Sequence, residues 1–414
     1  MKKIPMLLLW LGAAISISEI FTGGMLAPLG FAGGLGAILA GHLIGAGFLA
    51  YAGYISFIGK KSAMESVAES FGSGGGGIIA LCNVVQLLGW TIVMVVQAGS
   101  ALTGLIPAIP FPLAALILAL LALIWALMFG SPVGQGIHSL IVALLALLCI
   151  VLFAEAAGMR GTAGSGSGAG TESGGSSMSL MLAIELSIAM PVSWLPLVGD
   201  YSRKADGPVT AALMPFVGYF IGSVLMYALG LFISLRGGGD IFAFIAGSRF
   251  RLVACAVVLF STLTTAFLDL YSAVVSLGQL TGSGKTRAGK KDKPGGLKAK
   301  FWQNRDRLSL LGAGLFTLIV SALFPVERYS DFLTAFLTVI GMVFVPVYAL
   351  LFIDFIFRRM GPSSGEKGNA VPAFPLRILF IVAAGMAGYQ IFTRYELGIP
   401  SLLSMALVWG IYLM

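Results

Sequence analysis

The sequence predicts an all-α protein that crosses a lipid bilayer about twelve times. Hydrophobic residues make up 58% of the 414 residues and the mean hydropathy is +0.98, which excludes a soluble globular domain, whose apolar share is about half. The apolar residues form long runs, several of which exceed the roughly 20 residues that cross a bilayer. The 25 Lys and Arg lie mostly between those runs. The runs cover residues 6–28, 31–58, 78–105, 112–129, 136–156, 179–199, 208–235, 251–281, 308–324, 331–357, 373–392 and 399–414.

The distribution of positive charge predicts the orientation. If the N-terminus is cytoplasmic, the inner loops hold 19 Lys and Arg and the outer loops hold six. Inner loops of membrane proteins carry this excess, so we expect a cytoplasmic N-terminus, an even number of spans and a location in the cytoplasmic membrane. Nine of these charges lie in the basic loop 283–307. The formal net charge of +8 therefore reflects topology, and we expect no nucleic-acid partner.

The runs fall into two units of five spans. We expect residues 1–156 to form the first unit, 157–178 an external loop, 179–357 the second unit and 358–414 two further spans. Residues 161–177 are almost entirely Gly, Ser, Ala and Thr, a composition typical of flexible loops. The three cysteines each lie alone in an apolar run, so neither a disulfide framework nor a transition-metal site is predicted.

Two glycine-rich stretches resemble phosphate-binding loops without the required context. GSGKT at 282–286 has Gln279 where the Walker spacing needs glycine. Residues 72–77 fit G-x-G-x-x-G, but no strand precedes them, and we expect a turn between spans. Neither stretch predicts nucleotide binding.

The first span contains a polar interruption. After about ten apolar residues it meets Ser16, Ser18 and Glu19, followed by Thr22 and a glycine pair. Ten helical residues rise about 15 Å, so the interruption lies near the middle of the bilayer. A carboxylate there costs roughly 3 kcal/mol on insertion scales, which indicates a binding role. The alternative is that Glu19 sits at a span end and reaches water.

The sixth span repeats this pattern. It contains Glu185 in an apolar run, followed by Pro191 and Pro196, and proline disrupts a helix, so we expect a break between Met190 and Trp194. Two broken, acidic spans lie five spans apart, and an odd number of spans per unit makes the two units inverted. Such a pair indicates the midplane site of a secondary transporter. Alternatively, Glu185 lies in an outer turn and pairs with a hydroxyl group.

Spans three and eight each carry polar side chains on one helical face. In span three, an amide face could either line a substrate site or join helices by hydrogen bonds. In span eight, hydroxyl groups could either bind Na⁺ or bond to their own helix. The residues are Asn83, Gln86, Trp90 and Gln97 in span three, and Ser261, Thr264, Thr265, Asp269, Ser272 and Ser276 in span eight.

Three other polar groups are weaker candidates. His42 lies between glycines that indicate close helix packing, and we expect it to be hydrogen-bonded rather than to relay protons. Asp354 and Arg358 are spaced for an ion pair within one helix. Asp200 and Arg203, at the inner end of span six, could latch a cytoplasmic gate or cap the helix.

Residues 196–203, PLVGDYSR, resemble the signature of the nucleobase:cation symporter family, which includes cytosine and hydantoin permeases. Together with SISEIFTGGMLAPLGF, GHLIG and TTAFLDLYS, they make the chain most similar to the CytX branch of hydroxymethylpyrimidine permeases linked to thiamine biosynthesis. The resemblance implies a five-plus-five inverted repeat of the leucine-transporter type with two additional C-terminal spans. Two departures are Asp269, where relatives carry Asn, and the spacing of Gln86 from Trp90.

These arguments predict three groups of functional residues. The expected substrate-binding residues are Glu19, Asn83, Gln86, Trp90, Glu185, Met190, Pro191 and Asp269. The resemblance implies a cation site formed by backbone between Ala14 and Ser18 and by hydroxyls of span eight, with the expected members Ala14, Ile17, Ser18, Ser261, Thr264 and Thr265. The expected gate motif is Pro196, Asp200, Tyr201, Ser202 and Arg203.

The predicted function is import of a small planar pyrimidine together with Na⁺ or H⁺, with hydroxymethylpyrimidine as the favoured substrate. A carboxylate could accept hydrogen bonds from the exocyclic amine of an aminopyrimidine; Glu19 is the first choice for this role and Asp269 the second. The runner-up is a cytosine or other nucleobase permease. A membrane enzyme or a sensor is the alternative from a different class, but the chain has only two histidines and no nucleophile and base at a recognised spacing. We expect a monomer in a lipid bilayer with no cofactor besides the coupling ion.

Overall fold

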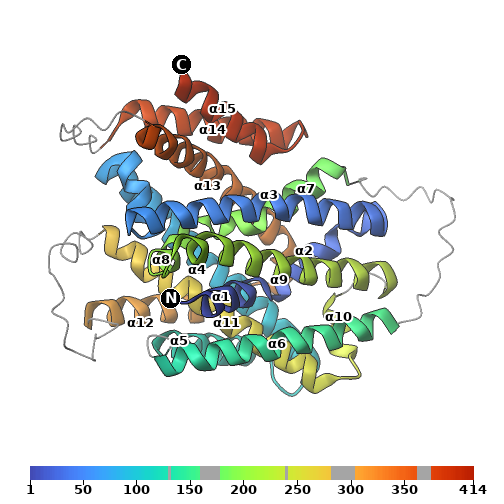
Figure 1. Cartoon of the computed structure of the whole chain (residues 1–414). Helices are drawn as coiled ribbons and strands as arrows, with labels where there is room; N and C mark the ends of the chain where they lie inside the picture. Colours follow the sequence, from blue (N-terminus) through green and yellow to red (C-terminus); the bar gives the residue numbers. More distant parts are fainter. Residues whose placement is uncertain (129–131, 159–177, 238–240, 281–303, 361–373) are drawn as a thin grey trace.

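The computed structural model describes residues 1–128, 132–158, 178–237, 241–280, 304–360 and 374–414, and every element in them is helical (Figure 1). The α-helices of the first half are α1 Lys3–Ala14, α2 Ile17–Met25, α3 Gly30–Gly59, α4 Ala63–Leu105, α5 Phe111–Met128 and α6 Pro132–Gly158. Those of the second half are α7 Leu180–Ser193, α8 Leu195–Ser202, α9 Pro208–Gly237, α10 Ile241–Gly247, α11 Arg251–Leu280, α12 Asn304–Ala322, α13 Tyr329–Met360, α14 Leu376–Arg394 and α15 Pro400–Leu413. Short 3₁₀ turns, η1 Ala27–Leu29 and η2 Val326–Arg328, precede α3 and α13.

The membrane character of the helices agrees with the sequence prediction. In the described residues, nine helices are long and apolar enough to span a membrane, or ten when the bent pair α1–α2 counts as one span. Residues 307–322 and helix α15 are apolar but shorter. Each predicted run contains a helix. An all-α polytopic fold is therefore confirmed, while the count of twelve crossings remains a prediction.

The predicted break in the first span is present. Helices α1 and α2 meet at an angle of 55°. The side chain of Ser16 accepts a hydrogen bond from the backbone N–H of Glu19 at 3.2 Å, so it caps α2. An N-cap residue has an extended rather than a helical backbone conformation, and Ser16 is the N-cap of α2. The polar residues themselves therefore produce the interruption.

The break in the sixth span also lies where the prolines predict it. Trp194 separates α7 from α8, and both Pro191 and Pro196 lack the N–H that a continuous helix would use. The change of direction is smaller than in the first span, since α7 and α8 together still satisfy the criteria for one span.

The expected turn at residues 72–77 is wrong. Ser62 and Glu65 form a capping box that starts α4 at Ala63, and helix continues through the glycines to Leu105. Only Gly72 leaves helical geometry, with φ 70° and ψ 175°. A single residue with positive φ is enough to kink the chain because glycine adopts this conformation without strain.

The helices pack in two groups. Helix α9 packs along α1, α2 and α3, and α3 also packs along α7 and α8. Helix α11 packs along α4 and α5, and α12 packs against the same two helices. Helix α13 lies against both α4 and α7, and the C-terminal pair α14–α15 packs on α13 (Figure 1). The two broken spans therefore belong to one group, and spans three and eight belong to the other.

Glycine allows the first broken span to approach α9 closely. A Cβ added to Gly230 would lie 1.8 Å from the carbonyl oxygen of Ile20, and one added to Gly23 would lie 2.2 Å from that of Tyr227. Such distances exclude any side chain at either position, so α2 and α9 are in backbone contact.

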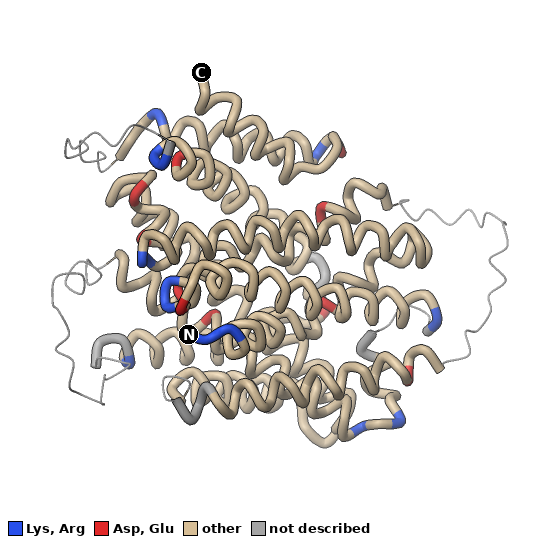
Figure 2. The backbone as a smooth tube through the Cα atoms, viewed as in Figure 1, with Lys and Arg blue, Asp and Glu red and all other residues tan. Residues whose placement is uncertain are grey.

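The described Lys and Arg side chains lie near the ends of the helices (Figure 2). Figure 2 shows Lys and Arg near the helix ends, whereas the middle of the bundle carries only isolated Asp and Glu positions. We call the end that carries Met1 the N-terminal face; the Met1 amino group donates a hydrogen bond to the carbonyl of Lys204 there. Lys61, Arg203 and Arg358 pair with carboxylates near this face. Which face is cytoplasmic remains the prediction made from the charge distribution.

Candidate functional site

Helices α4 and α11 run antiparallel, and one hydrogen bond sets their register. Asn83 Nδ2 donates to Ser276 Oγ at 2.9 Å. Seven residues along a helix correspond to about 10.5 Å and return to nearly the same face. Trp90 lies seven residues after Asn83, and Asp269 lies seven residues before Ser276. Trp90 and Asp269 therefore occupy the same depth on corresponding faces of the two helices.

We call the facing segments 83–90 of α4 and 269–276 of α11 the layer. The span-three amides connect this layer to the broken sixth span. Gln86 Nε2 donates to the carbonyl of Ser193 at 2.8 Å, and Asn83 Nδ2 donates to that of Pro196 at 3.1 Å. These carbonyls lie on either side of the break at Trp194. The interpretation that the amides join helices is thus confirmed, and the same contacts bring α7, α8, α4 and α11 together.

Three polar atoms in this layer are buried without a partner. Asp269 Oδ2, Gln86 Oε1 and Trp90 Nε1 make no hydrogen bond to any of the residues that the structure describes. All three side chains are at most 4% exposed. Buried polar groups nearly always have a partner in native proteins, so these atoms are suited to contact a ligand. Asp269 and Gln86 offer acceptors, and Trp90 offers a donor and a planar face.

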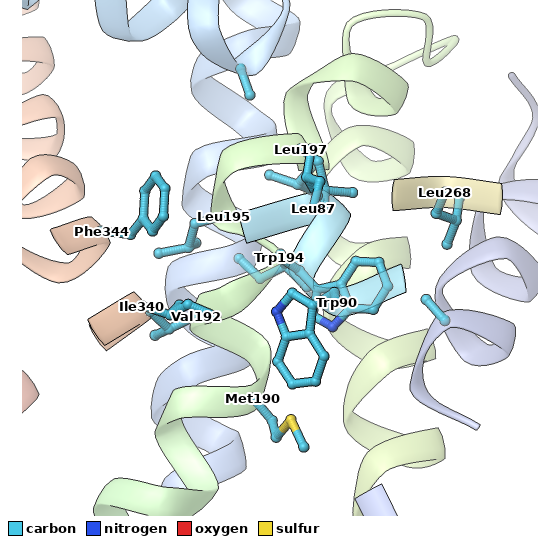
Figure 3. Packing of buried hydrophobic residues seen from close by; sticks show 14 of the residues in the cluster. Leu87, Trp90, Met190, Val192, Trp194, Leu195, Leu197, Leu268, Ile340 and Phe344 are labelled. Atoms are coloured by element: carbon cyan, nitrogen blue, oxygen red, sulfur yellow. The ribbon is translucent and has the colours of Figure 1, made fainter. Parts of the chain in front are cut away.

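The break in span six adds a second tryptophan that the sequence analysis did not select. Trp194 shares the hydrophobic cluster of Trp90; in Figure 3 the two residues lie at the centre of the view with Met190 below them. The rings of Trp194 and Trp10 are edge to face, with centroids 5.9 Å apart. The signal available in the sequence was its position directly after the Pro191 turn. The predicted site residues Met190 and Pro191 form the last turn of α7 beside it.

Glu19 lies outside this layer. Ser18 donates to Gln97, which is seven residues beyond Trp90 on α4, so the two positions differ by about 10 Å in depth. Both carboxylate oxygens of Glu19 already have partners on α9: Tyr219 Oη donates to Oε1 at 2.6 Å, and Ser223 Oγ lies 2.5 Å from Oε2. The side chain is 2% exposed. The alternative in which Glu19 reaches water at a span end does not describe this geometry.

The contacts of Glu19 continue to His42. Ser223 Oγ also lies 2.5 Å from His42 Nε2, and His42 Nδ1 donates to the carbonyl of Ile38 at 2.8 Å. Ser223 can give its single proton either to Glu19 or to His42, so one further proton resides on the carboxyl group or on the imidazole. In either arrangement the chain Glu19–Ser223–His42 has no net charge, which explains how a carboxyl group is tolerated at this depth. His42 is hydrogen-bonded, as expected.

Glu185 also lies away from the layer. Its carboxylate accepts hydrogen bonds from Tyr389 Oη at 2.9 Å, from Ser401 Oγ at 2.6 Å and from the backbone N–H of Ser401 at 3.0 Å. The pairing with hydroxyl groups that the alternative expected is present, but Glu185 lies inside α7 rather than in a turn. The partners belong to α14 and α15, which the sequence analysis did not connect with this residue.

The expected cation-binding residues lie on helices that pack against each other. Ala14 ends α1 and Ile17 begins α2, and α1 packs against α11. The three α11 hydroxyls each donate to their own helix: Ser261 to Val258 at 3.3 Å, Thr264 to Phe260 at 2.8 Å and Thr265 to Ser261 at 2.7 Å. Because these bonds use the hydroxyl protons, the oxygen lone pairs remain available to a cation.

The residues of the gate motif fasten α8 to the start of α4. Asp200 Oδ1 accepts the backbone N–H of Ala63 at 3.1 Å, and Arg203 Nη1 pairs with Glu65 Oε2 at 3.1 Å. Ser202 Oγ donates to the carbonyl of Ala211 at 2.9 Å. The ion pair is partly exposed, with side-chain exposures of 21% for Arg203 and 27% for Glu65. These contacts join the end of α8 to the start of α4 and to α9.

Another contact of the gate motif reaches α11. Tyr201 Oη lies 3.4 Å from the carbonyl of Leu268, the residue before Asp269, and the Tyr201 ring contacts Trp10 with centroids 6.3 Å apart. The gate motif is therefore connected both to the first broken span and to the helix that carries Asp269.

The family model for permeases of cytosine/purines, uracil, thiamine and allantoin matches residues 2–276, well over half of the chain. The chain belongs to this permease family. Membership makes it a membrane transporter rather than an enzyme. The CytX branch is not distinguished by this match. A comparison with curated proteins gives no match.

Solved structures agree with the fold of this permease. Mhp1, a nucleobase-cation-symport-1 family transporter in a closed conformation with bromovinylhydantoin bound, is 15% identical with a TM-score of 0.72, covering 100% of this chain and 91% of Mhp1. Inward-facing Mhp1 is 13% identical with a TM-score of 0.73, covering 98% and 88%. A Na⁺-coupled sialic acid symporter in an outward-open state is 13% identical with a TM-score of 0.63, covering 99% and 88%. At these identities the likeness concerns the fold, and it confirms the leucine-transporter type.

Proposed function

We propose that this permease imports a small aminopyrimidine, with hydroxymethylpyrimidine as the leading candidate and cytosine as the second, by exposing one midplane site alternately to the two faces. The observation that carries the proposal is the layer of unpartnered atoms between the two helix groups. Asp269 and Trp90 present an acceptor, a donor and an aromatic face at one depth, and Gln86 presents a second acceptor one helical turn away on α4. An aminopyrimidine offers the complementary N–H₂ group, ring nitrogens and planar surface.

The structure changes the preferred substrate ligand. Glu19 was the first choice from the sequence, but its two oxygens are occupied by donors from α9. Asp269 has no donor among the described residues, and a carboxylate without a partner gains most from a ligand that supplies N–H groups. We therefore assign the exocyclic amine to Asp269 and stacking to Trp90 and Trp194.

Import is proposed to be coupled to a cation. The break between α1 and α2 leaves backbone carbonyls at the end of α1, and the hydroxyls of Thr264 and Thr265 lie on the neighbouring helix α11. These are oxygen ligands of the kind that discontinuous helices offer to coupling ions. The family match identifies a permease without identifying its ion.

A competition experiment tests the substrate and the ion together. Uptake of labelled hydroxymethylpyrimidine is measured in cells that produce the protein, with unlabelled hydroxymethylpyrimidine, cytosine or thiamine as competitor. We expect the first two compounds to compete and thiamine, which is larger and carries a permanent charge, to compete weakly. Replacing Na⁺ by choline distinguishes the ion, because Na⁺-coupled uptake then stops. Uptake that persists in choline and stops with a protonophore indicates protons. A parallel measurement uses labelled cytosine, and absence of uptake of both pyrimidines would refute the proposal.

A further inference from the structure

Glu185 connects the first half of the broken sixth span to the C-terminal helix pair. All three hydrogen bonds that its carboxylate accepts come from Tyr389 on α14 and Ser401 on α15. Pro400 and Ser401 form the first turn of α15, where backbone N–H groups have no partner within the helix and negative charge is favoured. Glu185 therefore serves as an acceptor for the start of α15.

This contact is difficult to open. Glu185 is 5% exposed, and Tyr389 and Ser401 are 3% and 1% exposed. Separating the partners would leave a carboxylate, two hydroxyls and one amide N–H buried without hydrogen bonds, and water does not reach them to compensate. The ring of Tyr389 is also closely packed, since a Cβ on Gly341 of α13 would lie 2.2 Å from its hydroxyl oxygen.

The opposite end of the same span is held differently. At the N-terminal face, Arg203 pairs with Glu65, and both side chains are partly exposed. When this pair separates, water can solvate both charges, so a surface ion pair contributes little to holding the end closed. The start of α4 also donates one hydrogen bond, from the N–H of Ala63, to the buried carboxylate of Asp200, whereas Glu185 accepts three from α14 and α15.

The helices that hold the two ends of span six are hydrogen-bonded to one another. Trp409 on α15 donates to the carbonyl of Ala349 on α13 at 2.8 Å, and Tyr412 donates to Asp354 on α13 at 3.0 Å. Ser70, in the part of α4 before its kink, donates to the same carboxylate at 2.5 Å. Helices α15, α13 and the start of α4 thus form one support, which touches span six at Glu185 and again at its N-terminal-face end.

We propose that Glu185 is a positioning residue that acts as the fixed pivot of span six: α7 stays bound to α14 and α15 throughout transport, while α8 swings away from α4 to open the N-terminal face. The pivot rests on the transporter function proposed above. The pivot role differs from the substrate-binding role that the sequence suggested for Glu185. It also assigns a function to the two C-terminal helices, which is to hold α7 in place. Three buried hydrogen bonds hold α7 to α14 and α15, whereas one buried hydrogen bond and a partly exposed ion pair hold α8 to the start of α4, and this asymmetry determines which end moves.

Two cysteine pairs test the pivot, because cross-linking is expected to restore transport in one pair and to stop it in the other. Glu185→Cys with Ser401→Cys, and Glu65→Cys with Arg203→Cys, are made in a variant without Cys82, Cys149 and Cys255. Each pair is joined by a short, reducible bifunctional thiol reagent. We expect the Glu185–Ser401 pair to transport poorly when open and to recover when cross-linked. The Glu65–Arg203 pair should transport when open and stop when cross-linked, and reduction should reverse both effects.

Other outcomes contradict the pivot. Loss of transport on cross-linking positions 185 and 401 would mean that this contact must open. Continued transport with positions 65 and 203 cross-linked would mean that the N-terminal-face end does not swing. If the Glu185 variant does not fold, Tyr389→Phe and Ser401→Ala keep the carboxylate while each removes one donor. We expect them to reduce the maximal uptake rate and leave substrate affinity unchanged, whereas a substrate-binding Glu185 would predict a change in substrate affinity.

A readout without substrate separates this test from the proposed function. Ser56 on α3 is buried against α8, since a Cβ on Gly199 would lie 2.2 Å from its hydroxyl oxygen. Thiol labelling of Ser56→Cys therefore reports the swing of α8. Cross-linking positions 185 and 401 should leave labelling in place, and cross-linking 65 and 203 should suppress it. This result supports the pivot even if neither pyrimidine is taken up, and suppression by the 185–401 cross-link overturns it.

Discussion

Asp269→Asn is the most informative single substitution at the proposed site. The side chain is 1% exposed and Oδ2 has no partner among the described residues, so folding gains little from its charge and a ligand can use it. A hydrogen bond to a charged group contributes about 1.5–3 kcal/mol and a neutral one about 0.5–1.5 kcal/mol. The difference of roughly 1–1.5 kcal/mol corresponds to a rise of about 5- to 12-fold in the half-saturation concentration.

The assay is initial uptake of labelled hydroxymethylpyrimidine as a function of its concentration, with inhibition by the analogue that lacks the exocyclic amine as a second measurement. In the wild type, removal of the amine should weaken binding; in Asp269→Asn, it should matter much less, because the two changes remove the same interaction. Asp206→Asn is the matched control. The hydroxyl of Thr210 lowers the pKa of Asp206, so this variant also removes a charged carboxylate, but at the surface. Equal amine dependence in wild type and Asp269→Asn would refute the assignment.

Substitutions at three further positions test other parts of the structure. Trp90→Ala should weaken pyrimidine affinity by about 2- to 12-fold, the range for an aromatic pair of about 0.5–1.5 kcal/mol, while Trp90→Phe should lose less; equal losses in a binding assay would exclude stacking. Glu19→Gln should leave the half-saturation concentration unchanged, and a large loss of affinity in this variant would restore the substrate role of Glu19. Glu19→Ala leaves buried hydroxyl groups unpaired and should lower the stability of the protein, measured by thermal unfolding, by about 1–3 kcal/mol. Arg203→Gln removes a partly exposed ion pair that contributes about 1 kcal/mol, so the thiol of Ser56→Cys should be labelled up to about fivefold faster. An unchanged labelling rate would show that the ion pair does not restrain α8.

The broken spans could be predicted from local chemistry alone. Ser16 is a strong helix N-cap and Pro191 and Pro196 lack N–H groups, so the backbone must leave the regular helical pattern near them. The extent of α4 could not be predicted in this way. Its glycines discourage helix individually, yet tertiary packing and the capping box at Ser62 extend the helix through all of them except Gly72.

The partners of buried carboxylates were the main information missing from the sequence. Helical spacing placed Glu19, Glu185 and Asp269 at membrane depth, but it could not show which neighbouring helix each one faces. The donors of Glu19 are 200 and 204 residues away, and the hydroxyl donors of Glu185 are 204 and 216 residues away. Only the packing of helices reveals that Asp269 is the carboxylate left without a partner.

Concentrative uptake by sealed vesicles tests the central claim most directly. Purified protein is reconstituted into vesicles, an inward gradient of Na⁺ or H⁺ is imposed, and labelled hydroxymethylpyrimidine and cytosine are added outside. A cation-coupled importer should accumulate at least one of them, chemically unmodified, above its external concentration, and should lose this accumulation when the gradient is collapsed. Binding without accumulation, or recovery of a chemically altered compound inside, would contradict the account.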